Sequence, residues 1–373
     1  MIYLDNAATT PLSQLALDKL YEVNRDCFGN PSSLHSHGRK AAQVLRQARQ
    51  AIASHLKTDP NRLVFTSGGT EAITLAIKGY ALAQQKMSKH LITTTIEHHA
   101  VLHTVEALVR DYGFEVTYLS PKNGQISAQD VETALRPDTI LVSVMHTNNE
   151  TGYQLPIKEI AQLLRSHPAR LHVDAVQAIG KVPIYPEEEG IDFLSASGHK
   201  FHGPKGVGFL YTNTNRLKPL LVGGNQEDKR RASTENLASI AAMAEALTES
   251  LSSWQDNLAH VRQLKEDLIA GLDAAKIPYY LNQQEPVSPY VINIGFPNQL
   301  NERLLMQLDL AGISVSSGSA CTAGNIEPSH VLEAFYGSSS PRLKESIRIS
   351  LSSHTSSEDI QTLIATLINL LGE

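Results

Sequence analysis

The chain has 373 residues, enough to bury a large core, and its formal net charge of −6 gives no global positive field for nucleic acid or membrane surfaces. Its two cysteines exclude a disulfide framework and a cysteine-rich metal site, and its 15 histidines are scattered without a metal-binding helix motif. No secretion signal opens the sequence and no apolar run is long enough to cross a bilayer. We therefore expect a metal-free, cytoplasmic protein that binds neither membranes nor nucleic acid directly.

Short apolar runs typical of strands recur along the first two thirds of the chain, and helical segments such as 157–166 separate most of them. This alternation favours an α/β fold with a mainly parallel sheet and crossover helices. The runs lie at Leu63–Phe65, His90–Thr93, Glu115–Leu119, Ile140–Val144, Arg170–Val173, Phe193–Ala196 and Gly208–Tyr211.

The pattern changes in the last third of the chain. Residues 237–270 show the apolar spacing of long helices, and a strand-like run at 291–296 and a helix near 300–310 follow. A further run at 348–351 precedes a final helix. We expect a large domain of residues 13–250 and a smaller α/β domain of residues 251–373.

A glycine-rich turn follows the first of these strands. Gly68 and Gly69 separate the strand from a helix that we expect to run from about Thr70 to Gln85. Free N–H groups at the start of a helix and the Thr70 hydroxyl can hold a phosphate group, although such a segment is often only a turn. The spacing fits neither the dinucleotide fingerprint nor the Walker A loop.

Two later strand ends carry polar side chains. Asp174 ends one run, with Gln177 three residues further on, and Ser197, His199 and Lys200 follow the next run. Ligand groups gather at the carboxyl ends of strands in open α/β sheets. A lysine for a Schiff base and an acid for a pyridinium nitrogen are what a pyridoxal 5′-phosphate (PLP) site needs. A surface lysine and a helix-capping aspartate are the plainer alternative.

Cys321 lies among small residues in the stretch Val315–Gly324. Gly318 and Gly324 allow backbone freedom, and the small neighbours leave the sulfur accessible. Such a thiol is suited to act as a nucleophile, whereas an incidental cysteine on a surface loop is the alternative.

Together these motifs resemble the cysteine desulfurases of the NifS/IscS type, in the class V aminotransferase family of PLP enzymes. The resemblance runs nearly end to end, and Ser316–Cys321 marks the subgroup with a long cysteine-bearing loop. It implies the PLP-dependent transferase fold (aspartate-aminotransferase-like), with a mainly parallel seven-stranded sheet in the large domain and residues 1–12 joining 251–373. The motifs lie at Tyr3–Thr10, Phe28–Ser33, Thr66–Glu71, Glu97–Ala100, Met145–Gly152, His172–Gln177, Ser197–Lys200, Ser316–Cys321 and Ser346–Leu351.

The resemblance also implies roles for residues around the ring of the cofactor. Lys200 would hold PLP and move the substrate α-proton, with Lys205 as the competing lysine. Asp174 would pair with the ring nitrogen, and Gln177 would donate to the phenolate oxygen. His98 would stack on the ring as an acid or base, and His99 is its adjacent alternative.

Other residues would hold the phosphate and the substrate. The implied phosphate ligands are Gly69, Thr70, Ser197, His199 and, from the other subunit of a homodimer, Thr234. Asn149 would contact the cofactor or the substrate. Arg348 would pair with the substrate carboxylate, unless it is an exposed strand arginine.

The implied reaction converts L-cysteine to L-alanine and leaves the sulfur on Cys321 as a persulfide. The persulfide would pass to an acceptor protein, either an iron–sulfur scaffold or a tRNA-thiolation enzyme. Two alternatives stay open: another class V enzyme, such as a selenocysteine lyase or an aminotransferase, and a non-catalytic adaptor. Cys321 argues against transamination, which needs no thiol, and its occurrence together with Lys200 argues against the adaptor.

The segment Gly223–Thr234 departs from the family pattern. Thr234 is kept, but Asp228 replaces a usual arginine and Ser233 replaces a usual glycine. The glycine loss is expected to restrict the loop, and the charge reversal to alter a dimer edge. The sequence ends at Glu373, where longer relatives carry a tail that helps to dock the scaffold.

Overall fold

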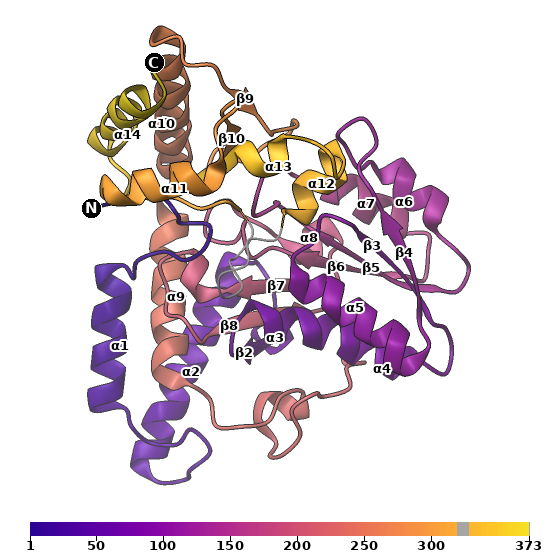
Figure 1. The fold of residues 1–373 in the computed structure, drawn as a ribbon. Coiled ribbons are helices and arrows are strands. Elements are labelled where there is room, and N and C mark those ends of the chain that lie inside the picture. The colour runs from indigo at the N-terminus through magenta and orange to yellow at the C-terminus, as the bar shows by residue number, and fades with distance from the viewer. Residues whose placement is uncertain (319–327, 373) are drawn as a thin grey trace.

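The computed structural model describes residues 1–318 and 328–372, and its centre is a seven-stranded sheet (Figure 1). The strand order is β2-β8-β7-β6-β5-β3-β4. Pairs from β4 through β3, β5 and β6 to β7 are parallel, whereas β8 is antiparallel to both β7 and β2. The mainly parallel sheet predicted from the sequence is confirmed. Its strands are β2 (Leu63–Thr66), β3 (His90–Thr94), β4 (Glu115–Leu119), β5 (Thr139–Met145), β6 (Arg170–Asp174), β7 (Phe193–Ser197) and β8 (Gly208–Thr212).

Both faces of the sheet are covered, which explains why its strands read as nearly continuous apolar runs. Leu141 and Val142, adjacent on β5, point to opposite faces and belong to different core clusters. One face packs against α3 (Gly69–Thr74), α4 (Tyr80–Gln84) and α5 (His99–Tyr112). The other packs against α2 (Ser36–His55), α6 (Ala128–Ala134), α7 (Ile157–Leu164) and α9 (Leu237–Ser252).

The helix expected from Thr70 to Gln85 is interrupted. It begins at Gly69 as α3, passes through a π-helical turn, η2 (Leu75–Gly79), and ends as α4. Residues 14–26 and 36–55 form α1 (Gln14–Asp26) and α2, two helices that the sequence patterns do not predict. Short helices complete this part of the chain: η1 (Pro60–Arg62), α8 (Pro186–Glu189), η3 (Gly198–Lys200) and η4 (Gln226–Lys229).

The last third of the chain builds a second core. Leu4 packs there with apolar residues between Val261 and Leu367, and the N-terminal strand β1 pairs in parallel with β11. Both ends of the chain accordingly lie beside this region (Figure 1). This separate core supports the proposed division into residues 13–250 and residues 1–12 with 251–373. Its elements are β1 (Ile2–Tyr3), α10 (Trp254–Ala274), β9 (Tyr280–Leu281), β10 (Val291–Gly295), α11 (Asn301–Leu310), β11 (Ile313–Ser314), α12 (His330–Tyr336), α13 (Arg342–Glu345), β12 (Ser346–Ser350) and α14 (Ser357–Leu371).

The strands β12, β10 and β9 of this second core form an antiparallel sheet. Asn293 of β10 donates from Nδ2 to the backbone oxygen of Glu150 at 3.1 Å, which ties the two cores together. None of the helices in residues 1–318 and 328–372 is long and apolar enough to span a membrane.

Candidate active site

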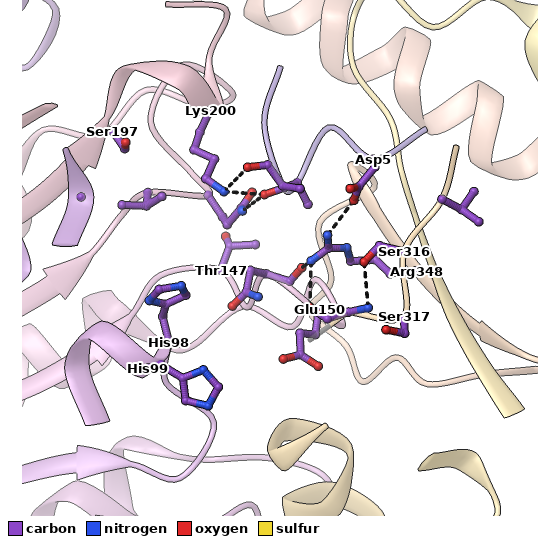
Figure 2. Close-up of a pocket in the computed structure, with 18 of the residues that line it drawn as sticks. Asp5, His98, His99, Thr147, Glu150, Ser197, Lys200, Ser316, Ser317 and Arg348 are labelled. Carbon is purple, nitrogen blue, oxygen red and sulfur yellow. Dashed lines mark hydrogen bonds and ion pairs between the residues drawn. The ribbon is translucent and has the colours of Figure 1, made fainter. Parts of the chain in front are cut away.

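A cavity of about 750 Å³ opens at the carboxyl ends of β5, β6 and β7 (Figure 2). It brings together most of the site residues predicted from the sequence. Thr234 does not line it, and Cys321 lies outside the described residues. The predicted residues that line the cavity are Gly69, Thr70, His98, Asn149, Asp174, Gln177, Ser197, His199, Lys200 and Arg348.

Lys200 reaches into the cavity from η3, directly after β7. Its Nζ donates to the backbone oxygens of Ala7 and Ala8 at 2.7 and 2.8 Å, so the N-terminal segment holds the amine in place (Figure 2). Burial, with a contribution from the charge of Arg348, lowers the pKa of Lys200 to about 8. An amine with this pKa is available as a nucleophile near neutral pH. Lys205, the competing lysine, is exposed and does not line the cavity.

Asp174 ends β6, and only 5% of its surface is exposed. Its Oδ1 accepts the Val176 N–H at 3.0 Å. Burial raises the pKa of Asp174 to about 6, against the opposing effects of that hydrogen bond and of Lys200. A positively charged ring nitrogen facing this carboxylate would offset the cost of burying its negative charge.

We expect Asp174→Asn to stabilise the cofactor-free protein at pH 8. Because the folded pKa is about 6 and the unfolded pKa about 3.9, stability is lost as pH rises from 4 through 6. The asparagine avoids this loss, which is up to about 3 kcal/mol. Urea unfolding at pH 8 and pH 4 measures it, and equal effects of the substitution at both pH values would contradict the account.

The turn between β2 and α3 is shaped by two glycines. Gly68 has φ of 152° and ψ of −174°, a conformation that L side chains rarely adopt. A Cβ on Gly69 would lie 2.9 Å from Cγ2 of Val176 and 3.9 Å from Oγ of Ser197. A side chain at Gly69 would therefore crowd Val176 and reach the Ser197 hydroxyl at the start of α3.

His199 extends this polar wall toward the N-terminal segment. One of its ring nitrogens, Nδ1, lies 3.1 Å from the Thr9 hydroxyl, and its backbone oxygen accepts from the Thr10 N–H at 2.9 Å. Burial lowers the pKa of His199 to about 4, and Lys200 adds to this effect. The ring is therefore neutral at physiological pH and suited to hydrogen bonding.

His98 caps α5 and faces the cavity (Figure 2). Its Nδ1 accepts the Ala100 N–H at 3.0 Å, so the proton of the neutral ring sits on Nε2. Although part of the ring is exposed to the open cavity, desolvation by the surrounding walls lowers the pKa of His98 to about 4, with Lys200 contributing. His99 also lines the cavity, but its ring lies 4.7 Å from the ring of His330.

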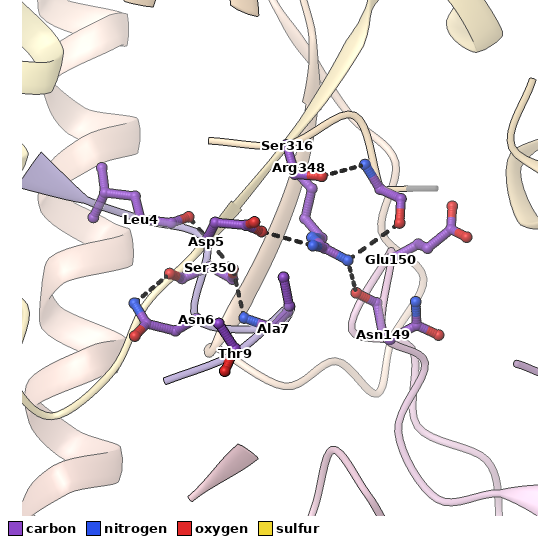
Figure 3. Close-up of polar contacts among 12 residues, drawn as sticks. Leu4, Asp5, Asn6, Ala7, Thr9, Asn149, Glu150, Ser316, Arg348 and Ser350 are labelled. Carbon is purple, nitrogen blue, oxygen red and sulfur yellow. Dashed lines mark hydrogen bonds and ion pairs between the residues drawn. The ribbon is translucent and has the colours of Figure 1, made fainter. Parts of the chain in front are cut away.

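Arg348 points into the site from β12 and is only 4% exposed, so it is not an exposed strand arginine. Nη2 bonds Oδ1 of Asp5 at 2.7 Å, while Nη1 donates to the backbone oxygens of Asn149 and Gly318 at 3.0 and 3.2 Å (Figure 3). Its Nε is buried and makes no hydrogen bond within the described part of the chain. The guanidinium is thus held from three segments, and its Nε donor is unused within the described residues.

Sequence reasoning missed several residues of the site. Asp5 and Glu150 line the cavity, whereas Glu97, the residue before His98, is buried and does not line it. Glu97 is fully buried, and its Oε1 accepts from the Thr94 hydroxyl at 2.7 Å and the Met145 N–H at 3.0 Å. Burial raises the pKa of Glu97 to about 8, so it stays protonated at neutral pH. The sequence feature that could have identified Glu97 is its position at the start of the Glu97–Ala100 motif.

The segment that departs from the family pattern lies in the long loop between β8 and α9, at the bottom of Figure 1. Ser233 has φ of 93° where a glycine is usual, and Glu227, Asp228 and Lys229 also have positive φ. Such angles are uncommon for residues with side chains. Thr234 is exposed on this loop, away from the cavity of its own chain.

The family profile described as aminotransferase class V matches residues 2–363, nearly the whole chain. The chain belongs to the class V aminotransferase family. Within that family it is of the NifS/IscS cysteine desulfurase type, as the relatives below show.

Curated relatives cover almost the entire length. The chain is 48% identical over 364 residues to putative cysteine desulfurase IscS 1 of Bacillus subtilis, covering 97% of this chain and 96% of that one. It is 39% identical over 373 residues to cysteine desulfurase IscS of Dictyoglomus turgidum, covering 99% and 94%.

Solved structures share the fold. A NifS-like protein superposes with a TM-score of 0.92 at 32% identity, covering 100% of this chain and 99% of that one. SspA in complex with cysteine superposes with a TM-score of 0.84 at 35% identity, covering 95% and 100%. The predicted PLP-dependent transferase fold is confirmed.

Proposed function

We propose that this cysteine desulfurase converts L-cysteine to L-alanine with PLP as its cofactor and Cys321 as the sulfur acceptor on the enzyme. The observation that carries the proposal is the convergence of Lys200, Asp174 and Arg348 on one cavity. A lysine, an acid and an arginine there can bind an aldehyde, a pyridine nitrogen and an amino-acid carboxylate.

The residues present fit PLP. When bound, this cofactor supplies an electron sink that makes the α-proton of an amino acid acidic. Asp174 would keep a proton on the ring nitrogen, His98 would lie against the ring, and Gln177 would donate to the phenolate oxygen. Gly69, Thr70, Ser197 and His199 would hold the phosphate, and Asn149 would contact the cofactor or the substrate.

Lys200 would move the substrate proton because its amine, with a pKa of about 8, can both accept and return it near neutral pH. Arg348 would orient the substrate through its carboxylate. Since Asp5 already bonds Nη2, the substrate would add to this pair or displace Asp5 from it.

Cys321 would receive the sulfur. Its thiolate attacks the sulfur of the bound cysteine, an S–S bond forms and the Cβ–S bond breaks. The alanine skeleton takes up a proton at Cβ and leaves, and the persulfide remains on Cys321. The persulfide would then pass to an iron–sulfur scaffold or a tRNA-thiolation enzyme in the cytoplasm.

The direct test is to incubate the purified, PLP-loaded protein with L-cysteine and a thiol reductant. We expect equal amounts of alanine and sulfide. Formation of pyruvate or of a keto acid in place of alanine would identify a different class V reaction.

We also propose that the protein is a homodimer in which Thr234 completes the site of the other subunit. The support is that Thr234 is exposed and does not reach its own cavity, although the family pattern assigns it to the phosphate.

Sedimentation at assay concentrations should show a dimer, and Asp228→Arg should alter its dissociation constant more than its turnover. The Asp228 side chain is 79% exposed and pairs only with Arg230, at 3.3 Å, among the described residues. Charges at the rim of an interface mainly tune association. A PLP-saturated, fully active monomer would refute the shared site.

A further inference from the structure

We propose that Lys181 is a positioning residue that fixes the side-chain amide of Gln177, so that Nε2 rather than Oε1 faces the Lys200 amine. This inference rests on the proposed PLP site. The proposed mechanism assigns no role to Lys181.

The contacts form a short chain that ends at Lys200. Nζ of Lys181 donates to Oε1 of Gln177 at 2.9 Å, and Nε2 of Gln177 donates to the backbone oxygen of Ala7, also at 2.9 Å. Nζ of Lys200 donates to the same Ala7 oxygen at 2.7 Å. The Gln177 amide and the Lys200 amine are therefore neighbours on one acceptor.

Both ends of this chain select one orientation of the amide. Nζ of Lys181 donates to Oε1 in the structure, and in its protonated form it has no acceptor that could face Nε2 instead. A backbone carbonyl accepts and cannot donate, so only Nε2 can face Ala7. Without Lys181 only the Ala7 contact holds this orientation, so turning the amide oxygen toward the Lys200 amine costs one hydrogen bond instead of two.

Lys181 acts from behind the site. It does not line the 750 Å³ cavity, but lines a separate space of about 20 Å³ together with Lys200, Asn6 and Tyr290. Its amine lies 5.4 Å from the centre of the Tyr290 ring. The one hydrogen bond that this amine makes among the described residues goes to Gln177.

This placement is costly for a cation. Burial, together with the charges of Lys200 and Arg348, lowers the pKa of Lys181 to about 7. A methionine of similar length would fill the space without that cost. The contact with Gln177 gives a reason for a lysine at this position.

The orientation matters for the chemistry at Lys200. A donor N–H beside this nitrogen disfavours its protonated form, whereas a carbonyl oxygen in its place favours that form. Loss of Lys181 should therefore raise the pH midpoint at which the absorbance of the Lys200-bound cofactor changes.

The experiment titrates the cofactor absorbance against pH in four proteins: wild type, Lys181→Met, Gln177→Ala and the double variant. We expect Lys181→Met to raise the midpoint by about one pH unit, the order of one hydrogen bond. In the Gln177→Ala background the same substitution should add little. Lys205→Met is the matched control and should leave the midpoint unchanged, since Lys205 is exposed outside the cavity.

An unchanged midpoint in Lys181→Met would overturn the proposal, and so would an equal shift with and without Gln177, because the charge of Lys181 would then act directly. Urea unfolding of the cofactor-free variants checks the fold, and Lys181→Leu replaces a methionine variant that does not fold. Failure of both to fold would assign Lys181 to core stability and also overturn the proposal. If wild-type protein binds no PLP, the proposed function itself fails.

Discussion

Lys200→Ala is expected to lower the rate of alanine formation by about a thousandfold or more, because the variant loses both the covalent anchor of PLP and the proton carrier. The fold should survive, since the substitution removes a buried amine whose pKa is already lowered to about 8. Borohydride reduction followed by peptide mass mapping should find PLP on Lys200 in the wild type and on no lysine in the variant.

Lys205→Ala is the matched control for this prediction. Lys205 lies five residues further on, is exposed, and does not line the cavity, so its removal should leave the rate and the reduction product unchanged. PLP trapped on Lys205, or a fully active Lys200→Ala protein, would show that the cofactor site is misassigned.

Cys321→Ser is expected to bind PLP and L-cysteine normally, but its rate of alanine release should fall by about a thousandfold or more. The substitution keeps the size of the side chain and replaces a sulfur nucleophile with a weakly nucleophilic hydroxyl. Because Lys200, Asp174 and Arg348 remain, the spectral change on adding L-cysteine should persist. Stopped-flow absorbance and alanine analysis separate the two steps.

Cys27→Ser serves as the control for the thiol. Cys27 is half-buried at the end of α1, where its N–H donates to the Val23 oxygen at 2.9 Å, and it does not line the cavity. We expect full activity. Loss of activity in both cysteine variants would point to a relay between the two thiols.

Much of the fold could be predicted because its sheet is covered on both faces. Strands of that kind read as apolar runs between turns, and six of the seven predicted runs ended one residue before the strand does. At β6 and β7 that residue is polar, Asp174 or Ser197, and faces the cavity. The rule that ligands bind at strand ends therefore located the site.

What the sequence could not predict depends on contacts between distant segments. Asp5 bonds Arg348 across 343 residues, and Ala7 bonds both Gln177 and Lys200. Backbone acceptors such as the Ala7 oxygen carry no signal in the sequence. The same holds for burial: the Glu97–Ala100 motif marks the position of Glu97 but does not show that its carboxyl group is buried.

The most direct test of the account is to locate the transferred sulfur. The PLP-loaded protein is incubated with L-cysteine without reductant, its free thiols are alkylated, and its peptides are analysed by mass spectrometry. We predict one added sulfur atom on the peptide containing Cys321, none on the peptide containing Cys27, and one alanine for each persulfide formed. Alanine formation with an unmodified Cys321, or sulfur on Cys27 instead, would contradict the proposed mechanism.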